Sequence, residues 1–145
     1  MSQSNKFGVR LFLKGPCRPL AEFIPVFHSW IQRRALAGHQ LIDVHDYSHV
    51  ADGPGILLVA HEANLNFDGR SLTYTRKQSL PLAETVAIAR QAAQLLELPF
   101  TGTPFEVFVN DRLATVTVAE VATVVTGKVT VKPGDPRERQ TFVVA

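Results

Sequence analysis

The side chains best suited to chemistry lie between residues 45 and 62, where histidines and carboxylates stand close together. His45, Asp46, His49 and the pair His61-Glu62 are of the types that ligate metals and transfer protons near neutral pH. A helix would bring His45 and His49 together, because they are four residues apart. In a strand their Cα atoms are about 13 Å apart, so they cannot bind one ion without a bend. The spacing therefore predicts no metal site, and no cofactor is expected.

Common catalytic and nucleotide-binding motifs are absent from the sequence. There is no G-x-S-x-G, no H-E-x-x-H and no glycine-rich nucleotide fingerprint. The glycine-containing segment 49–55 joins two expected strands, so it lacks the helix N-terminus on which phosphate-binding loops depend. We interpret it as a turn. Asp43, Asp46 and Tyr47 beside it are the remaining polar candidates, and their simplest role is to hold the hairpin through bonds from side chain to backbone.

These candidates lie in a stretch, residues 41–76, that predicts three antiparallel strands at 41–49, 55–67 and 71–76. Asp68-Gly69 predicts a two-residue hairpin turn, because such turns need positive φ angles. The segment 50–55 holds two glycines around a proline and predicts a longer connection. The rest of the chain is expected to pack on this three-stranded unit.

The remaining elements follow from the spacing of apolar residues. Alternation predicts a strand at 7–13 and another at 103–110. A stripe at helical spacing predicts a helix over 24–36 capped by Gly38, and Ser79 predicts the start of a second helix. In the tail, Thr117 and Glu120 have the spacing of a capping box, which favours a short helix. Segments 128–132 and 140–144 could form a late hairpin, within the chain or exchanged with a partner subunit.

This order predicts an α+β fold, a two-layer sandwich with helices on one face of a mainly antiparallel sheet. The plan is strand, helix, three strands, helix, strand, which is ferredoxin-like in outline. Residues 1–112 are expected to form the core domain and 113–145 a C-terminal extension. The extra strand in the middle leaves the strand order open.

The strand at 55–67 has apolar odd positions, among them Leu57 and Val59, which predicts that these residues and His61 face the helices. The opposite face would then combine apolar and polar side chains and be too apolar to remain uncovered. A second copy, the chain's own tail or a ligand could cover it. The residues expected in this binding or interface surface are Phe12, Asp43, His45, Tyr47, His49, Ile56, Leu58, Glu62 and Phe108.

Composition limits the classes of protein that remain. The chain has 145 residues and a net charge of +2, which fits one domain and gives no sign of nucleic-acid binding. Because it shows neither an export signal nor 18 consecutive apolar residues, we expect a cytoplasmic protein without a membrane partner. The single cysteine, Cys17, excludes an internal disulfide and is expected to be a small buried residue.

The leading functional hypothesis is a non-enzymatic, self-associating binding or assembly module, with a homodimer favoured. It acts through the second face of the sheet. The alternative is a small enzyme that uses His45, His49, Tyr47 and a carboxylate in a cleft on that face.

Overall fold

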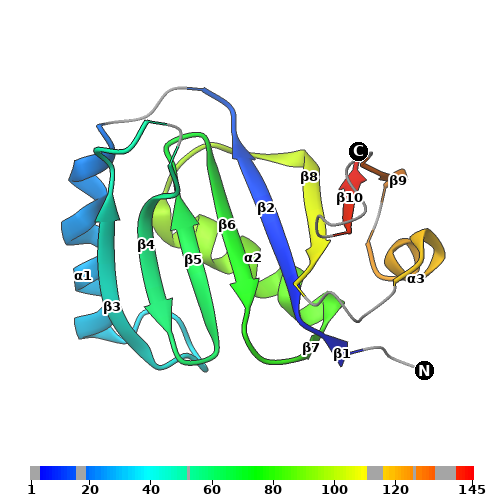
Figure 1. Ribbon diagram of the computed structural model, residues 1–145, viewed down its shortest axis with the longest axis horizontal. Coiled ribbons are helices and arrows are strands. Elements are labelled where there is room, and N and C mark those ends of the chain that lie inside the picture. Colours follow the sequence, from blue (N-terminus) through cyan, green and yellow to red (C-terminus); the bar gives the residue numbers. More distant parts are fainter. Residues whose placement is uncertain (1–3, 16–18, 52, 111–115, 126, 133–139) are drawn as a thin grey trace.

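The computed structural model describes residues 4–15, 19–51, 53–110, 116–125, 127–132 and 140–145. These residues form an α+β fold around an eight-stranded antiparallel sheet in the order β3-β4-β5-β6-β2-β8-β10-β9 (Figure 1). The strands are β2 (Phe7–Leu13), β3 (Leu41–Tyr47), β4 (Gly55–Ala60), β5 (Ala63–Phe67), β6 (Ser71–Arg76), β8 (Phe100–Val109), β9 (Val129–Val131) and β10 (Thr141–Val144). The short strands β1 (Ser4–Asn5) and β7 (Leu80–Pro81) pair with each other.

Four helical segments accompany the described part of the sheet: η1 (Leu20–Phe23), α1 (Ile24–Arg33), α2 (Leu82–Leu96) and α3 (Val118–Ala122). Helix α1 is shorter than expected, because Arg34 adopts a left-handed φ of 52° and ends it ahead of Gly38. Helix α2 begins after Pro81 rather than at Ser79. The capping box of α3 is confirmed, since the Glu120 N–H donates to Thr117 Oγ1 and the Thr117 N–H donates to Glu120 Oε2.

Helices α1 and α2 cover one side of the sheet, which we call the inner face. The Phe23 ring, just before α1, packs edge-on against Phe67 of β5, with ring centroids 4.7 Å apart. Helix α2 contacts β2, and its Arg90 lies over the ring of Phe105 in β8. In Figure 1 α2 lies behind β5, β6 and β2, and no described helix lies in front of these strands. We call this open side the outer face.

The chain reverses direction in a tight bend at residues 61–62. Residues 55–67 therefore form two antiparallel strands, β4 and β5, rather than one. The register pairs Ile56 with Phe67 and Leu58 with Leu65, which puts even positions of β4 and odd positions of β5 on the inner face. Ile56 and Leu58 are 0% exposed. Their expected place on the second face was wrong, because a single alternation does not hold across the bend.

The bend also places His61 in the exposed connection between β4 and β5. The expectation that His61 faces the core was therefore wrong. The pairing of β3 with β4 and of β5 with β6 is confirmed. The turn after β5 has two residues, as expected, but lies one position later, at Gly69-Arg70: the Asp68 N–H donates to the Ser71 carbonyl oxygen, and Gly69 has a positive φ of 89°. Asp68 Oδ1 closes this turn by accepting from the Arg70 and Ser71 N–H groups.

The tail contributes to the main sheet. The late hairpin is confirmed, because β9 pairs with β10, and β10 pairs with β8 of the same chain. The ferredoxin-like plan is not confirmed, because the main sheet has eight strands; β2 lies in its interior between β6 and β8. Cys17, the expected boundary after residue 112 and the turn at 133–136 lie outside the described residues.

Candidate functional site

The outer face carries a row of side chains that crosses every strand of the main sheet. Each member stands directly opposite the next in the strand register, so residues distant in the sequence become neighbours. From β3 to β9 the row consists of His45, Leu57, Asn66, Thr73, Arg10, Glu106, Val143 and Thr130. The middle of this outer-face row is polar. Asn64 and Thr75, which pair with each other two residues away on the same face, extend the polar surface beyond the row.

A cavity of about 500 Å³ lies over this polar region. Its volume is within the range of roughly 300–1,000 Å³ that is typical for small-molecule sites. The segment before β4 supplies Gly53 and Pro54, and strands β2, β4, β5 and β6 supply most of the other side chains. The lining of this outer-face cavity is Arg10, Gly53, Pro54, Leu57, Asn64, Asn66, Asp68, Thr73 and Thr75.

Several polar groups of the cavity have no partner in the part of the chain that the structure describes. The side chains of Asn64, Asn66 and Thr75 make no hydrogen bond there, and Asn64 Oδ1 is buried without one. Burying an unpaired polar atom costs about 1–3 kcal/mol, so native structures usually pair such an atom with protein, water or a ligand. Hydrogen-bonding capacity is therefore concentrated on β5 and β6.

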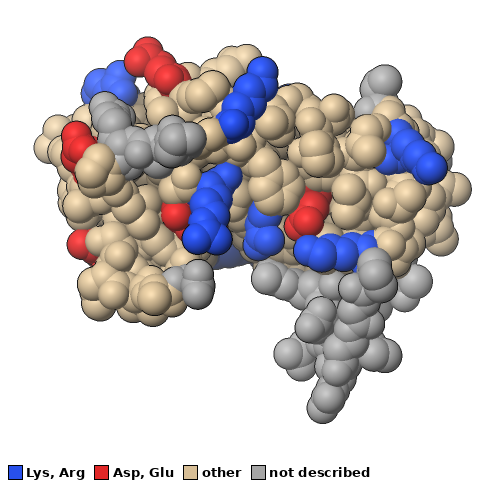
Figure 2. Space-filling view, turned by 90° about the horizontal axis from the view of Figure 1, so that it is seen from above, with Lys and Arg blue, Asp and Glu red and all other residues tan. Residues whose placement is uncertain are grey.

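The charged groups of the same region are paired. Arg10 donates from Nε to Thr73 Oγ1 (3.2 Å), and its Nη1 lies 3.6 Å from Glu106 Oε1. Glu106 also accepts from Lys132 Nζ at 3.2 Å. The carboxylate of Asp68 is engaged by the turn after β5. On the side of the molecule seen in Figure 2, basic and acidic side chains are likewise interspersed among uncharged surface.

The expected residues of β3 lie on the outer face but away from the cavity. His45 Nε2 lies 3.9 Å from Asp43 Oδ2, and the His45 ring stacks with Tyr47 at a centroid distance of 6.4 Å. His49 is exposed in the turn after β3. The cavity lining contains none of these four residues, so the structure does not assemble them into a cleft there.

The predicted bond from a side chain to the hairpin turn is present for Asp46, whereas Asp43 bonds its neighbour within β3. Asp43 Oδ1 accepts from the Val44 N–H, and Asp46 Oδ1 accepts from the Ser48 N–H at 2.8 Å. Hydrogen bonds from the side chain and the backbone of Ser48 hold the pKa of Asp46 below its usual value.

The two phenylalanines expected on the outer face are both on the predicted side of the sheet. Phe12 is half-buried opposite Ser71, and Phe108 stands opposite Gly8. The Phe108 ring lies directly over Gly8, and a Cβ added at Gly8 would overlap the ring. Phe108 is 5% exposed, so little of it is available to a ligand.

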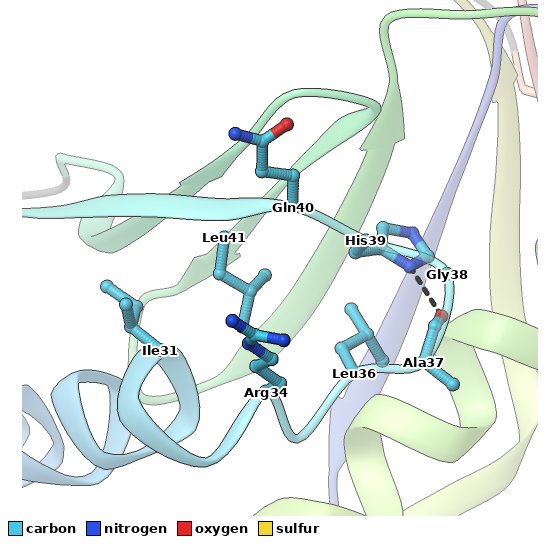
Figure 3. A pocket seen from close by; sticks show the side chains of 8 residues that line it. All are labelled: Ile31, Arg34, Leu36, Ala37, Gly38, His39, Gln40 and Leu41. Atoms are coloured by element: carbon cyan, nitrogen blue, oxygen red, sulfur yellow. Dashed lines mark hydrogen bonds between the residues drawn. The ribbon is translucent and has the colours of Figure 1, made fainter.

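A second cavity, of about 700 Å³, lies where α1 ends (Figure 3). Its lining is Ile31, Arg34, Leu36, Ala37, Gly38, His39, Gln40 and Leu41. His39 donates from Nδ1 to the Ala37 carbonyl oxygen at 2.9 Å, since a carbonyl oxygen can only accept (Figure 3). In the neutral imidazole, Nε2 then accepts from the Tyr74 hydroxyl at 2.6 Å.

Behind His39 the network continues into the inner face. Arg76 Nη1 donates to the Tyr74 hydroxyl oxygen at 3.0 Å, and both residues are buried. Burial raises the pKa of Tyr74. Glu62, an expected site residue, lies in the nearby bend, where the Gln40 N–H donates to its Oε1 and lowers its pKa. Because both nitrogens of His39 and the Tyr74 hydroxyl are engaged, this network fastens the segment after α1 to the sheet.

No family model, curated protein or solved structure matches this chain. The candidate site therefore rests on its own geometry. Within the described ranges, no three His, Cys, Asp or Glu residues are placed to hold a metal ion. Nor is any helix in the described part of the chain both long enough and apolar enough to cross a membrane.

Sequence reasoning missed the residues that line the outer-face cavity. Asn64 and Asn66 alternate with Ala63, Leu65 and Phe67, and this alternation already indicates a polar outer side for β5. Thr73 and Thr75 show the same pattern between Leu72 and Tyr74. The predicted candidates were mainly histidines and carboxylates, whereas most of the polar lining of the cavity consists of neutral amides and hydroxyls.

Proposed function

We propose that this protein is a non-enzymatic binding module that holds a small polar molecule in the outer-face cavity. The observation that carries the proposal is the set of hydrogen-bonding groups on Asn64, Asn66 and Thr75 that lack partners among the described residues. A ligand would supply the missing partners. Amides and threonine hydroxyls do not titrate near neutral pH, which favours binding over proton-transfer catalysis.

Mapping by NMR tests this proposal. The ¹⁵N-labelled full chain would be titrated with a mixed library of small polar fragments, and we expect shifted amide signals to cluster on β5 and β6. Asn66→Ala should weaken the hits, whereas His45→Gln, in the same row but outside the cavity, should leave them unchanged. Hits confined to the second cavity near His39 would contradict the proposal.

Self-association is a second candidate function, now through β3 rather than the sheet face. With Ile56 and Leu58 in the chain's own core, exposed large apolar side chains remain at both edges of the sheet: Ile42 (55%) and Val50 (46%) in and after β3, and Val131 (53%) in β9. The charges on β3 and the irregular register between Leu41 and Asp43 oppose strand-to-strand pairing. Contact would therefore be made by side chains.

Light scattering of the parent and of Ile42→Lys tests the second candidate. A dimer that Ile42→Lys converts to a monomer would support it, whereas a parent that is monomeric at micromolar concentration would rule it out.

The enzyme alternative relies on His45, His49 and Tyr47, which lie on or beside the exposed β3 edge. It would gain support from a turnover that His45→Gln abolishes without changing the melting temperature.

A further inference from the structure

The charge state of the outer-face cavity limits the ligand that it can take. Arg10 and Asp68 are the charged side chains in the lining, and their charges have opposite signs. Each also has partners within the chain: Arg10 has Thr73 and Glu106, and Asp68 has two backbone N–H groups. An ionic ligand would compete with these partners for the charge of opposite sign and would meet the charge of its own sign in the same cavity. The cavity therefore favours an uncharged ligand.

The free groups also determine what kind of uncharged ligand fits. Each amide of Asn64 and Asn66 presents donors and an acceptor, and the Thr75 hydroxyl can do both. A ligand that satisfies them must itself alternate donors and acceptors at short intervals, as the hydroxyls of a sugar or polyol do. Leu57 and Pro54 add a small apolar surface that suits the C–H groups of a sugar ring.

On these grounds, and resting on the proposed function, we propose that the outer-face cavity binds a neutral, hydroxyl-rich small molecule of the size of a mono- or disaccharide. The strand register supports this assignment, because Asn64 stands opposite Thr75 and Asn66 opposite Thr73. Neighbouring strands are about 4.8 Å apart, so these side chains form a closely spaced grid of polar groups. Such a grid can contact several hydroxyls of one ring at once.

The test compares neutral and charged versions of the same ring. The full chain, ¹⁵N-labelled, would be titrated with glucose, galactose, mannose, N-acetylglucosamine and maltose. Parallel titrations would use glucuronic acid, glucosamine and glucose 6-phosphate, and a capped dipeptide amide would represent uncharged ligands without hydroxyls. We expect at least one neutral sugar to shift signals on β5 and β6 and to bind at least about 10-fold tighter than its charged counterparts.

A matched pair of variants on the same face separates specific from general effects. Thr75→Val removes one cavity hydroxyl at nearly constant volume and should weaken binding of the neutral sugar about 5- to 10-fold. Thr130→Val makes the same change in the outer-face row at β9, outside the cavity, and should leave affinity unchanged. Equal effects of the two variants would overturn the assignment of the cavity.

The remaining outcomes distinguish this inference from the function on which it rests. Binding of only the charged compounds or the dipeptide amide at β5 and β6 would overturn the sugar assignment and leave the binding module intact. If no compound of this panel binds there, the sugar assignment also fails. The mixed-fragment titration then decides separately whether the cavity binds any small molecule.

Discussion

Two adjacent leucines in β4 provide the sharpest test of which side of the sheet is the core. Leu58 is 0% exposed and stands opposite Leu65 on the inner face, whereas Leu57 stands opposite Asn66 and borders the outer-face cavity. Truncating a fully buried leucine removes its packing and leaves a cavity, which costs about 2–5 kcal/mol. Leu58→Ala should therefore destabilise the protein by about 3 kcal/mol, and Leu57→Ala by about 1 kcal/mol or less.

Urea unfolding followed by tryptophan fluorescence suits this comparison, because the chain has one tryptophan, Trp30, and it is buried. Both variants should keep the parent's dependence of unfolding free energy on urea, so that the midpoint shift reports stability alone. For a chain of this length, 3 kcal/mol corresponds to a melting temperature lower by about 6–12 °C. If Leu57→Ala proved the more damaging change, the alternation assigned to β4 would be reversed and the outer-face cavity would lose its basis.

Three further predictions concern the inner face and the tail. Trp30→Ala, which removes a core side chain packed edge-on against Phe27, should cost about 3–5 kcal/mol in the same urea assay; a melting temperature within two degrees of the parent would contradict this packing. Thr117→Ala should cost about 1 kcal/mol by removing the acceptor for the Glu120 N–H, and Thr117→Ser should restore most of it. Tyr74→Phe should cost about 1–3 kcal/mol by removing the hydroxyl that bonds buried Arg76 and half-buried His39. Because the pKa of Tyr74 is raised in the folded state, parent stability should fall as the pH rises above the usual value of 10.0, and this fall should be smaller in Tyr74→Phe.

Two of the three hairpins within residues 41–76, β3 with β4 and β5 with β6, could be predicted from sequence because glycines mark their turns. Gly69 supplies a positive φ at one turn, and Gly55, with a φ of 79°, supplies another at the start of β4. The bend at residues 61–62 has no glycine, proline, asparagine or aspartate to mark it. Without such a mark, the alternation of β4 was continued into β5, and the faces of Ile56 and Leu58 were exchanged.

The candidate site was predicted less well than the fold, for a related reason. Asp43, His45 and Tyr47 were assigned to the correct face, because their alternation along β3 is unbroken between residues 43 and 47. The partners that complete the outer-face row come from β2, β8 and the tail, and local patterns do not reveal which strands meet across such distances in sequence. The pairing of Arg10 with Glu106 is of this kind, since it depends on the place of β2 between β6 and β8.

That place of β2 also has a consequence for the order in which the protein folds. Strands β3 to β6 pair with their neighbours in sequence, so they can form a four-stranded meander through short loops at low entropic cost. Strand β2 is synthesised before them, yet its partners begin at Ser71 and Phe100. During translation β2 therefore remains without a partner strand, and its apolar side remains exposed, until β6 has emerged. Strand β8 completes the pairing of β2 later still. This high contact order predicts that docking of β2 limits the folding rate, and that β2 is the segment most in need of protection on the ribosome.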